Sequence, residues 1–130
     1  MADTKMKILV VDDFATMRRI IKNILRQGGY KNIVEADDGT TALPKLRTDT
    51  IDLVIADWNM PRMTGLDLLK AMRSDKALKD IPFLMVTAEA RKDNIIEAIQ
   101  CGASSYLVKP FTVETLSEKI DQIFSQQSET

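Results

Sequence analysis

The chain has 130 residues, 18 Lys and Arg against 19 Asp and Glu for a net charge of −1, one cysteine and no histidine. This length suits one compact domain, and the near-zero net charge disfavours a general nucleic-acid binder, which usually carries a basic excess. A lone cysteine and the lack of histidine exclude an intrachain disulfide, a Cys/His zinc site and a Ser-His-Asp or Cys-His catalytic pair, so any chemistry must use carboxylates, lysine, hydroxyls or an oxygen-bound metal.

The first predicted elements are a strand and a helix. Lys7–Val11 is a short apolar run of the kind that forms a buried strand. Ala15–Gln27 carries apolar residues at helical spacing, with Arg18 and Lys22 on the opposite, polar face, and Gly28-Gly29 is expected to end the helix.

The middle of the chain repeats this order. Asn32–Ala36 predicts a weaker strand, and Gly39–Arg47 predicts a short helix. We expect Pro44 to kink or shorten that helix, because proline lacks a backbone N–H. Asp52–Ala56 predicts a third strand, and Gly65–Ser74 predicts a helix.

The last part adds two further strand–helix units. Pro82–Val86 predicts a strand, Arg91–Cys101 a helix, Ser105–Val108 a strand and Val113–Phe124 a final helix. A strand followed by a helix, repeated in this way, is typical of a parallel sheet with helices on both faces, joined by right-handed crossovers. We therefore predict an α/β fold, with its ligand crevice at the carboxyl ends of the strands.

Polar side chains follow four of these strands. They are Asp12 and Asp13 after the first strand, Asp57 after the third, Thr87 after the fourth and Lys109 after the fifth. Clustered carboxylates repel one another unless a cation intervenes, and an all-oxygen set favours a hard ion such as Mg²⁺. Lys109 and Thr87 could then hold a phosphate group on the same metal.

Each of these residues also has an ordinary structural interpretation. A single Asp after a strand is commonly a turn former or a helix cap, Thr87 could be a cap, and Lys109 could be a solvated lysine. Their joint placement at the strand ends favours function. A carboxylate is already ionised at pH 7, so it can attack phosphorus without a histidine base, and an aspartyl phosphate is covalent chemistry that this chain can support.

Four sequence motifs carry a family resemblance. Val10–Phe14, Asp57–Pro61, Val86–Ala90 and Val108–Phe111 closely resemble the motifs of two-component response regulator receiver domains, and Thr16–Arg19 resembles the chemotaxis members of that family. The resemblance implies one receiver domain over residues 1–130 without an output domain. It also implies a flavodoxin-like three-layer sandwich with a five-stranded parallel sheet in the order 2-1-3-4-5, and a cis peptide bond before Pro110.

The resemblance also implies residue roles. Asp57 would be the phosphoacceptor, Lys109 and Thr87 would bind the phosphoryl group, and Thr87 and Tyr106 would act as a switch. The Mg²⁺ ligands would be Asp12 (through water), Asp13, Asp57 and the backbone carbonyl of Asn59. Asn59 and Glu89 would tune the lifetime of the phosphoryl group. The output face would comprise Lys92, Ile95, Ile99, Tyr106 and Lys119.

The implied partners are a chemotaxis histidine kinase as phosphodonor and a flagellar motor switch protein as target, with room for a dedicated phosphatase. Such a protein is expected to be a cytoplasmic monomer that binds neither nucleic acid nor membrane. It would catalyse only its own phosphotransfer and slow autodephosphorylation. No apolar run approaches the roughly 20 residues that span a bilayer, and the apolar start is too short for a signal peptide.

Three alternatives from other classes remain at this point. A phosphatase of the haloacid dehalogenase type also uses a strand-end Asp, but it generally needs a second acid two residues later, where this chain has Asn59. A flavodoxin-like cofactor binder would place a phosphate next to Asp12 and Asp13, which would repel it. A degenerate receiver that serves only as an interaction module is the third.

Overall fold

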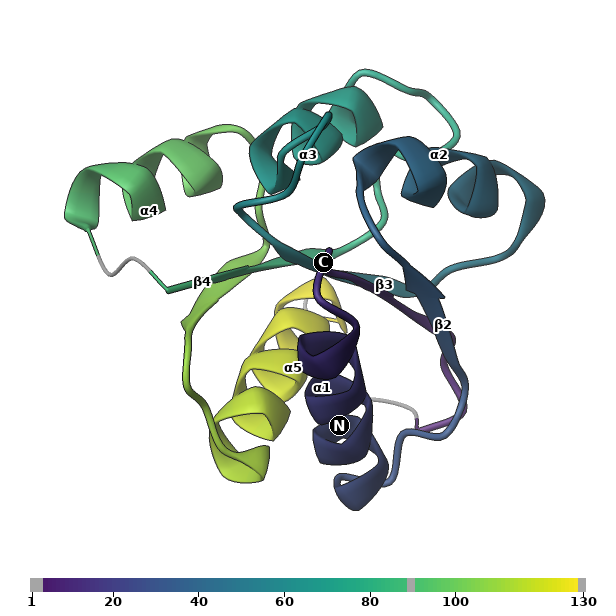
Figure 1. The fold of residues 1–130 in the computed structure, drawn as a ribbon, viewed down its shortest axis with the longest axis vertical. Coiled ribbons are helices and arrows are strands. Elements are labelled where there is room, and N and C mark those ends of the chain that lie inside the picture. Colours follow the sequence, from purple (N-terminus) through teal and green to yellow (C-terminus); the bar gives the residue numbers. More distant parts are fainter. Residues whose placement is uncertain (1–3, 89–90, 129–130) are drawn as a thin grey trace.

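The computed structural model describes residues 4–88 and 91–128, with side chains described as far as residue 125. Five strands alternate with five helices along the chain (Figure 1). The strands are β1 (Ile8–Val11), β2 (Ile33–Ala36), β3 (Leu53–Asp57), β4 (Phe83–Thr87) and β5 (Ser105–Val108). The helices are α1 (Ala15–Gln27), α2 (Gly39–Thr48), α3 (Gly65–Arg73), α4 (Lys92–Gln100) and α5 (Val113–Ser128).

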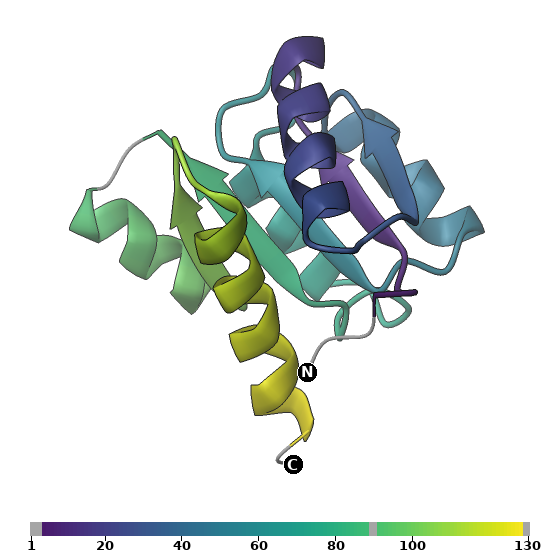
Figure 2. The same ribbon diagram turned by 90° about the horizontal axis from the view of Figure 1, so that it is seen from below.

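The strands form one parallel sheet in the order β2-β1-β3-β4-β5. Helices α2, α3 and α4 cover one face of the sheet, and α1 and α5 lie side by side on the other (Figures 1 and 2). The predicted three-layer α/β sandwich and its strand order are therefore confirmed. Within the described part of the chain, no helix has the length and apolarity needed to cross a membrane.

The three central strands feed two separate cores, because successive side chains of a strand point to opposite faces. Leu9 and Val54 lie in the core under α2, α3 and α4, whereas Ile8 and Leu53 lie in the core under α1 and α5. Strands β1, β3 and β4 are buried throughout. The uniformly apolar runs in the sequence are explained by this double burial.

The edge strands differ from the central ones. Three of the four residues of β2 are only partly buried, in keeping with the weaker strand that the sequence predicts. Strand β5 forms the opposite edge, and its partly buried residues include Tyr106.

Two helices run further than predicted. Pro44 does not shorten α2, which continues to Thr48, and a capping box from Asp38 fixes the first turn of this helix. Helix α5 continues to Ser128, beyond the expected end at Phe124, so the loss of its apolar pattern does not end it.

Candidate functional site

The polar residues predicted from the sequence meet at the carboxyl edge of the sheet. Val11 lies opposite Ala56 on β3, so Asp12 follows β1 beside the end of β3, where Asp57 is the last residue. Asp57 lies opposite Val86 on β4, which ends one residue later at Thr87. The parallel register alone therefore brings side chains that are distant in the sequence to one edge.

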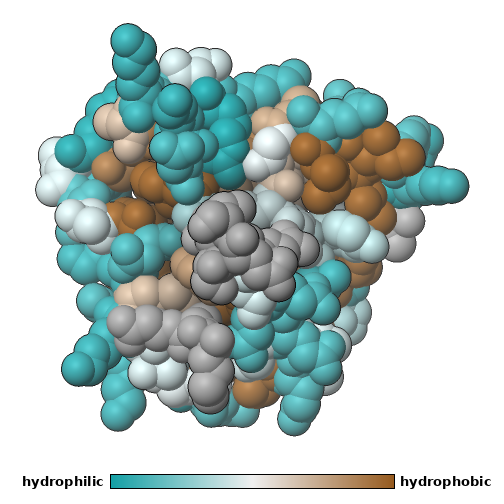
Figure 3. Space-filling view, turned by 180° about the vertical axis from the view of Figure 1, so that it is seen from behind, coloured by the Kyte–Doolittle hydropathy of each residue, from teal (hydrophilic) through white to brown (hydrophobic). Residues whose placement is uncertain are grey.

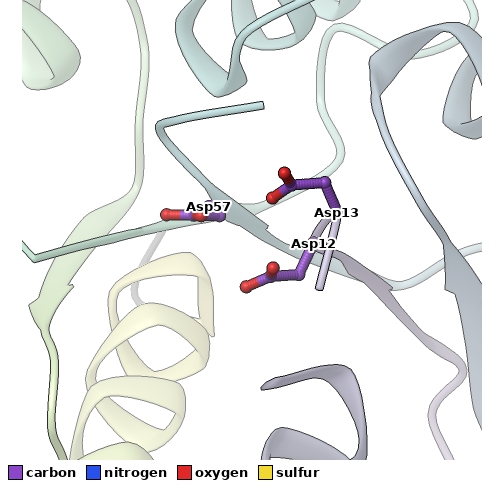
Figure 4. Close-up of side chains that lie close together, drawn as sticks. All are labelled: Asp12, Asp13 and Asp57. Carbon is purple, nitrogen blue, oxygen red and sulfur yellow. The ribbon is translucent and has the colours of Figure 1, made fainter. Parts of the chain in front are cut away.

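The carboxylates of Asp12, Asp13 and Asp57 form a tight acidic cluster. One oxygen from each lies within 4.8 Å of the others, and Figure 4 shows all three side chains extending to the same side of the strand ends. Asp12 is fully buried, and its Oδ1 accepts a hydrogen bond of 2.9 Å from the backbone N–H of Phe14. The Oδ1 atom of Asp13 is buried without any hydrogen-bond partner in the structure.

Among the described residues, Lys109 forms the ion pairs with this cluster. Its Nζ lies 3.4 Å from Oδ2 of Asp12 and 3.4 Å from Oδ2 of Asp57. Burial raises the pKa of Asp57 above its usual value, although the charge of Lys109 opposes the shift; the charge of Asp12 adds to it. A single ammonium group therefore does not fully compensate the buried acids.

An unpaired buried oxygen is costly, and so is a cluster of carboxylates with one lysine. A divalent cation bound among the carboxylates would remove both costs, and the all-oxygen donor set suits a hard ion. The residues present therefore fit a metal site formed by Asp12, Asp13 and Asp57.

The loop after β3 is packed closely against Asp57. The backbone N–H of Asn59 donates a hydrogen bond to the Asp57 carboxylate, and the Asn59 side chain is exposed. Gly65, at the start of α3, donates its N–H to the carbonyl of Trp58 at 2.9 Å. A Cβ atom at Gly65 would collide with the backbone carbonyl of Asp57, so only glycine fits here.

The remaining predicted site residues lie around this core. Thr87 is 3% exposed and ends β4, and its carbonyl accepts the N–H of Lys109 at 2.8 Å. The peptide bond between Lys109 and Pro110 is cis, as predicted. Tyr106 is partly buried on β5, packed against the core under α4, and Nζ of Lys119 lies 4.9 Å from the centre of its ring.

The match to known proteins covers almost the whole chain. Residues 8–121 match the model of the response regulator receiver domain. The chain belongs to the response regulator receiver domain family. It is 62% identical over 121 residues to the chemotaxis protein CheY of Pseudomonas aeruginosa, covering 93% of this chain and 98% of that protein. It is 60% identical to CheY-3 of Vibrio cholerae, covering 93% of both chains.

Solved structures agree with this assignment. The chemotaxis response regulator CheY4 of Vibrio cholerae matches with a TM-score of 0.83 at 37% identity, over 92% of this chain and 98% of that one. A receiver domain from Clostridium thermocellum matches with a TM-score of 0.83 at 31% identity, over 95% and 97% of the two chains. The chain is thus a CheY-like receiver domain, and the phosphatase and flavodoxin-like alternatives are set aside.

In this receiver domain, the residues predicted as the output face lie on α4, β5 and α5. Lys92 is exposed at the start of α4, Ile95 is partly buried, and Ile99 is 45% exposed. Figure 3 views the molecule from behind, so α4, on the left in Figure 1, lies on the right, where an apolar patch is visible. Ile96 adds to the exposed apolar surface of this helix. These residues therefore lie on the edge strand β5 and on the two helices that contact it, α4 and α5.

Sequence analysis missed two arginines that hold the loops of the receiver site. Arg18, which was assigned to the polar face of α1, donates from Nη1 to the carbonyl of Asp12 at 2.6 Å. Arg62, in the loop after β3, has a φ of 63° and pairs with the fully buried carboxylate of Asp38. The contact between Arg62 and Asp38 joins residues 24 positions apart, which only the folded chain brings together. Arg18 lies only six residues after Asp12, but the amphipathic pattern of α1 does not indicate a hydrogen bond to a backbone carbonyl. Glu89, expected to tune the phosphoryl lifetime, lies outside the described residues.

Proposed function

We propose that this receiver domain is a chemotaxis response regulator that accepts a phosphoryl group on Asp57 from a phosphohistidine of a sensor kinase. The observation that carries the proposal is the set of groups around Asp57. Its buried carboxylate lies 3.4 Å from Nζ of Lys109 and shares a cluster with Asp13, whose Oδ1 has no partner. The relatives named CheY support the assignment to chemotaxis.

The chemistry follows from these groups. A carboxylate oxygen of Asp57 forms a bond to phosphorus while the P–N bond of the phosphohistidine breaks. The electron pair of that bond passes to the imidazole nitrogen, which takes up a proton from solvent. Lys109 holds a phosphoryl oxygen with its ammonium group, and the N–H of Asn59, which contacts Asp57, keeps the acceptor carboxylate in place.

The cation in this proposal is Mg²⁺. Asp12 (through water), Asp13, Asp57 and the carbonyl of Asn59 would hold it, as the family resemblance implies. When bound, Mg²⁺ neutralises charge on the transferring phosphoryl group. The buried, unpartnered Oδ1 of Asp13 supports this assignment from the structure.

Phosphorylation then biases an existing two-state equilibrium. Thr87, at the end of β4, moves toward the phosphoryl group and leaves room into which Tyr106 turns. The face formed by Lys92, Ile95, Ile99, Tyr106 and Lys119 changes shape and binds a flagellar motor switch protein. The Tyr106 side chain is partly buried, with Nζ of Lys119 over its ring, so it lies between the exposed and buried positions that this switch requires.

In this proposal the protein acts in the cytoplasm and is no turnover enzyme. Fast release of phosphate would need an acid two residues after the nucleophile, and Asn59 occupies that position. Asp57 therefore keeps its phosphoryl group until slow autodephosphorylation or a dedicated phosphatase removes it.

The test uses acetyl phosphate as a small phosphodonor, with Mg²⁺, and intact-mass spectrometry. The wild-type protein should gain one hydroxylamine-labile phosphoryl group, and Asp57→Asn should gain none. The matched control is Asp80→Asn, which removes an exposed carboxylate far from the site and should be labelled like the wild type. Labelling of Asp57→Asn at the wild-type level would reject Asp57 as the acceptor.

The partner is tested with the labelled protein. Binding of a motor-switch peptide should be tighter for phosphorylated wild type than for unphosphorylated wild type, and Ile99→Ala should change that binding without changing phosphorylation. Equal affinity of both forms for the peptide would reject the flagellar motor as the target while leaving the phosphoacceptor in place.

A further inference from the structure

Arg18 joins three parts of the molecule at the β1 edge of the site. Its Nη1 donates to the backbone carbonyl of Asp12 at 2.6 Å, and its Nε donates to Oε1 of Glu35 on β2 at 3.2 Å. The Arg18 side chain is 19% exposed although it lies on the polar side of α1. The planar guanidinium group thus makes two contacts at fixed relative directions.

The Asp12 carbonyl is part of the peptide unit that joins Asp12 to Asp13. A donor on that oxygen fixes the orientation of the peptide plane and therefore the direction in which the chain carries Asp13. The Asp13 carboxylate has no hydrogen bond on Oδ1 to fix it from its outer end. The hydrogen bond that Arg18 donates to the Asp12 carbonyl fixes the backbone just before Asp13, and it therefore helps to set the position of the Asp13 carboxylate.

Glu35 in turn holds Arg18. Its two oxygens accept from Nε of Arg18 and from Nζ of Lys22, at 3.2 and 3.0 Å. The hydrogen bond from Lys22 lowers the pKa of Glu35 against a smaller effect of burial, with Arg18 adding to the lowering. Glu35 lies opposite Val10 in the register of β1 and β2, so the sheet itself anchors the carboxylate.

We propose that Arg18, held by Glu35, is a positioning residue that sets the Asp12–Asp13 peptide in the orientation needed to bind a divalent cation. This inference rests on the proposed function, in which Asp12 and Asp13 belong to a Mg²⁺ site. Arg18 touches neither the metal nor the phosphoryl group in this assignment. It acts through the backbone of Asp12.

Two effects of Arg18 on metal affinity have opposite signs, and this makes the inference testable. A positive charge near the acidic cluster repels Mg²⁺, so removal of charge alone should tighten binding slightly. Loss of the hydrogen bond to the Asp12 carbonyl should weaken binding. Groups that orient metal ligands typically change affinity by about 10- to 100-fold when they are removed, so we expect the positional effect to exceed the charge effect.

The experiment measures the dissociation constant of Mg²⁺ from the fluorescence of Trp58, next to Asp57, together with thermal unfolding in EDTA. Arg18→Ala should raise the dissociation constant about tenfold. Arg18→Lys keeps the charge, but an ammonium group cannot make both the contact to the Asp12 carbonyl and the contact to Glu35 in the geometry of the guanidinium group. It should therefore raise the dissociation constant by a smaller factor. Glu35→Gln should also give a smaller rise. The matched control is Arg19→Ala, which removes an exposed cation from the neighbouring position of α1 and should leave binding unchanged or slightly tighter.

The inference is overturned if Arg18→Ala binds Mg²⁺ as tightly as Arg19→Ala, because the hydrogen bond to the Asp12 carbonyl would then have no effect on the metal site. It is likewise overturned if Arg18→Lys binds Mg²⁺ as tightly as the wild type, because the two-contact geometry of the guanidinium group would then not be needed. It is also overturned if Arg18→Ala lowers only the unfolding temperature in EDTA, because the role is then structural. Should Arg18→Ala fail to fold, Arg18→Lys and Glu35→Gln decide in its place. Absence of Mg²⁺ binding by the wild-type protein would instead reject the metal site of the proposed function.

Discussion

The Nζ atom of Lys109 lies 3.4 Å from Oδ2 of Asp57, although β4 separates the strands that carry the two residues. The contact spans the sheet because β5 ends one residue before Lys109, and the lysine side chain is long enough to reach back over the end of β4. It places a cation against an aspartate side chain that is 8% exposed. Lys109 therefore opposes the rise that burial causes in the pKa of Asp57, and it does so from beyond a strand that is not adjacent to β3.

Replacement of Lys109 should change both the titration and the reactivity of Asp57. In Lys109→Gln, the pKa of Asp57 should rise further, because the charge of Lys109 opposes the rise that burial causes. Labelling by acetyl phosphate at saturating Mg²⁺ should slow on the order of 100-fold, the usual loss when one preorganised charge or donor is removed. Lys70→Gln, on the exposed side of α3, is the control and should leave both quantities unchanged. A labelling rate within about twofold of the wild type would show that Lys109 does not bind the phosphoryl group.

Addition of Mg²⁺ should stabilise the protein through Asp13. At a Mg²⁺ concentration 100 times the dissociation constant, the free energy of unfolding should rise by about 2.7 kcal/mol. Asp13→Asn should lose most of this gain, because it removes one of the clustered carboxylates. In EDTA the same variant should be at least as stable as the wild type, because one of the mutually repelling charges is gone. Urea titrations with and without Mg²⁺ measure both differences, and a full Mg²⁺ gain in Asp13→Asn would place the metal elsewhere.

The pH dependence of stability should report the burial of Asp57. Because burial raises its pKa in the folded state, the unfolded chain binds fewer protons at this site between the two pKa values. The contribution of Asp57 to stability is therefore complete at pH values below the usual pKa of 3.8 and is lost as the pH rises through the raised folded value. Asp57→Asn has no such loss, so in EDTA at pH 7 it should be more stable than the wild type.

The comparison is made by urea titration over a pH series. The advantage of Asp57→Asn should disappear as the pH is lowered, and Asp80→Asn, which changes an exposed carboxylate, should show no comparable trend. A difference between Asp57→Asn and wild type that stays constant with pH would mean that the ionisation of Asp57 is not its source.

Much of the site could be predicted from the sequence because it rests on backbone topology. Apolar runs predict strands buried on both faces, and parallel strands end at one edge, so Asp12, Asp57 and Lys109 had to lie near one another once the order of elements was known. The position of Asp13 follows for the same reason. Strand order itself came from the family resemblance, since periodicity alone does not distinguish it from other orders.

The contacts that could not be predicted are those made by long side chains across the sheet. Arg18 and Arg62 resemble ordinary surface arginines in the sequence, and their carboxylate partners, Glu35 and Asp38, become neighbours only through the fold. The prediction that Pro44 shortens α2 was wrong because it considered only the local loss of a backbone donor. Pro44 removes one backbone donor from α2, but the capping box at Asp38 and packing of the apolar face keep the helix intact to Thr48.

Gly65 links the packing of the fold to the geometry of the acceptor. It is the buried first residue of α3, and a Cβ atom there would collide with the carbonyl of Asp57 and lie 3.0 Å from Sδ of Met85. Gly65→Ala should therefore destabilise the protein by about 1–3 kcal/mol, the usual cost of overpacking, and should slow labelling of Asp57 because the backbone of the acceptor must shift. The matched control is Gly28→Ala, where the nearest atom to an added Cβ is the hydroxyl of Ser117 at 3.2 Å, a side chain that can move. That variant should change the free energy of unfolding by less than about 1 kcal/mol and leave labelling unaffected. If Gly65→Ala matched Gly28→Ala in urea titrations and in labelling rate, the loop after β3 would have to be far more yielding than its contacts with Asp57 indicate.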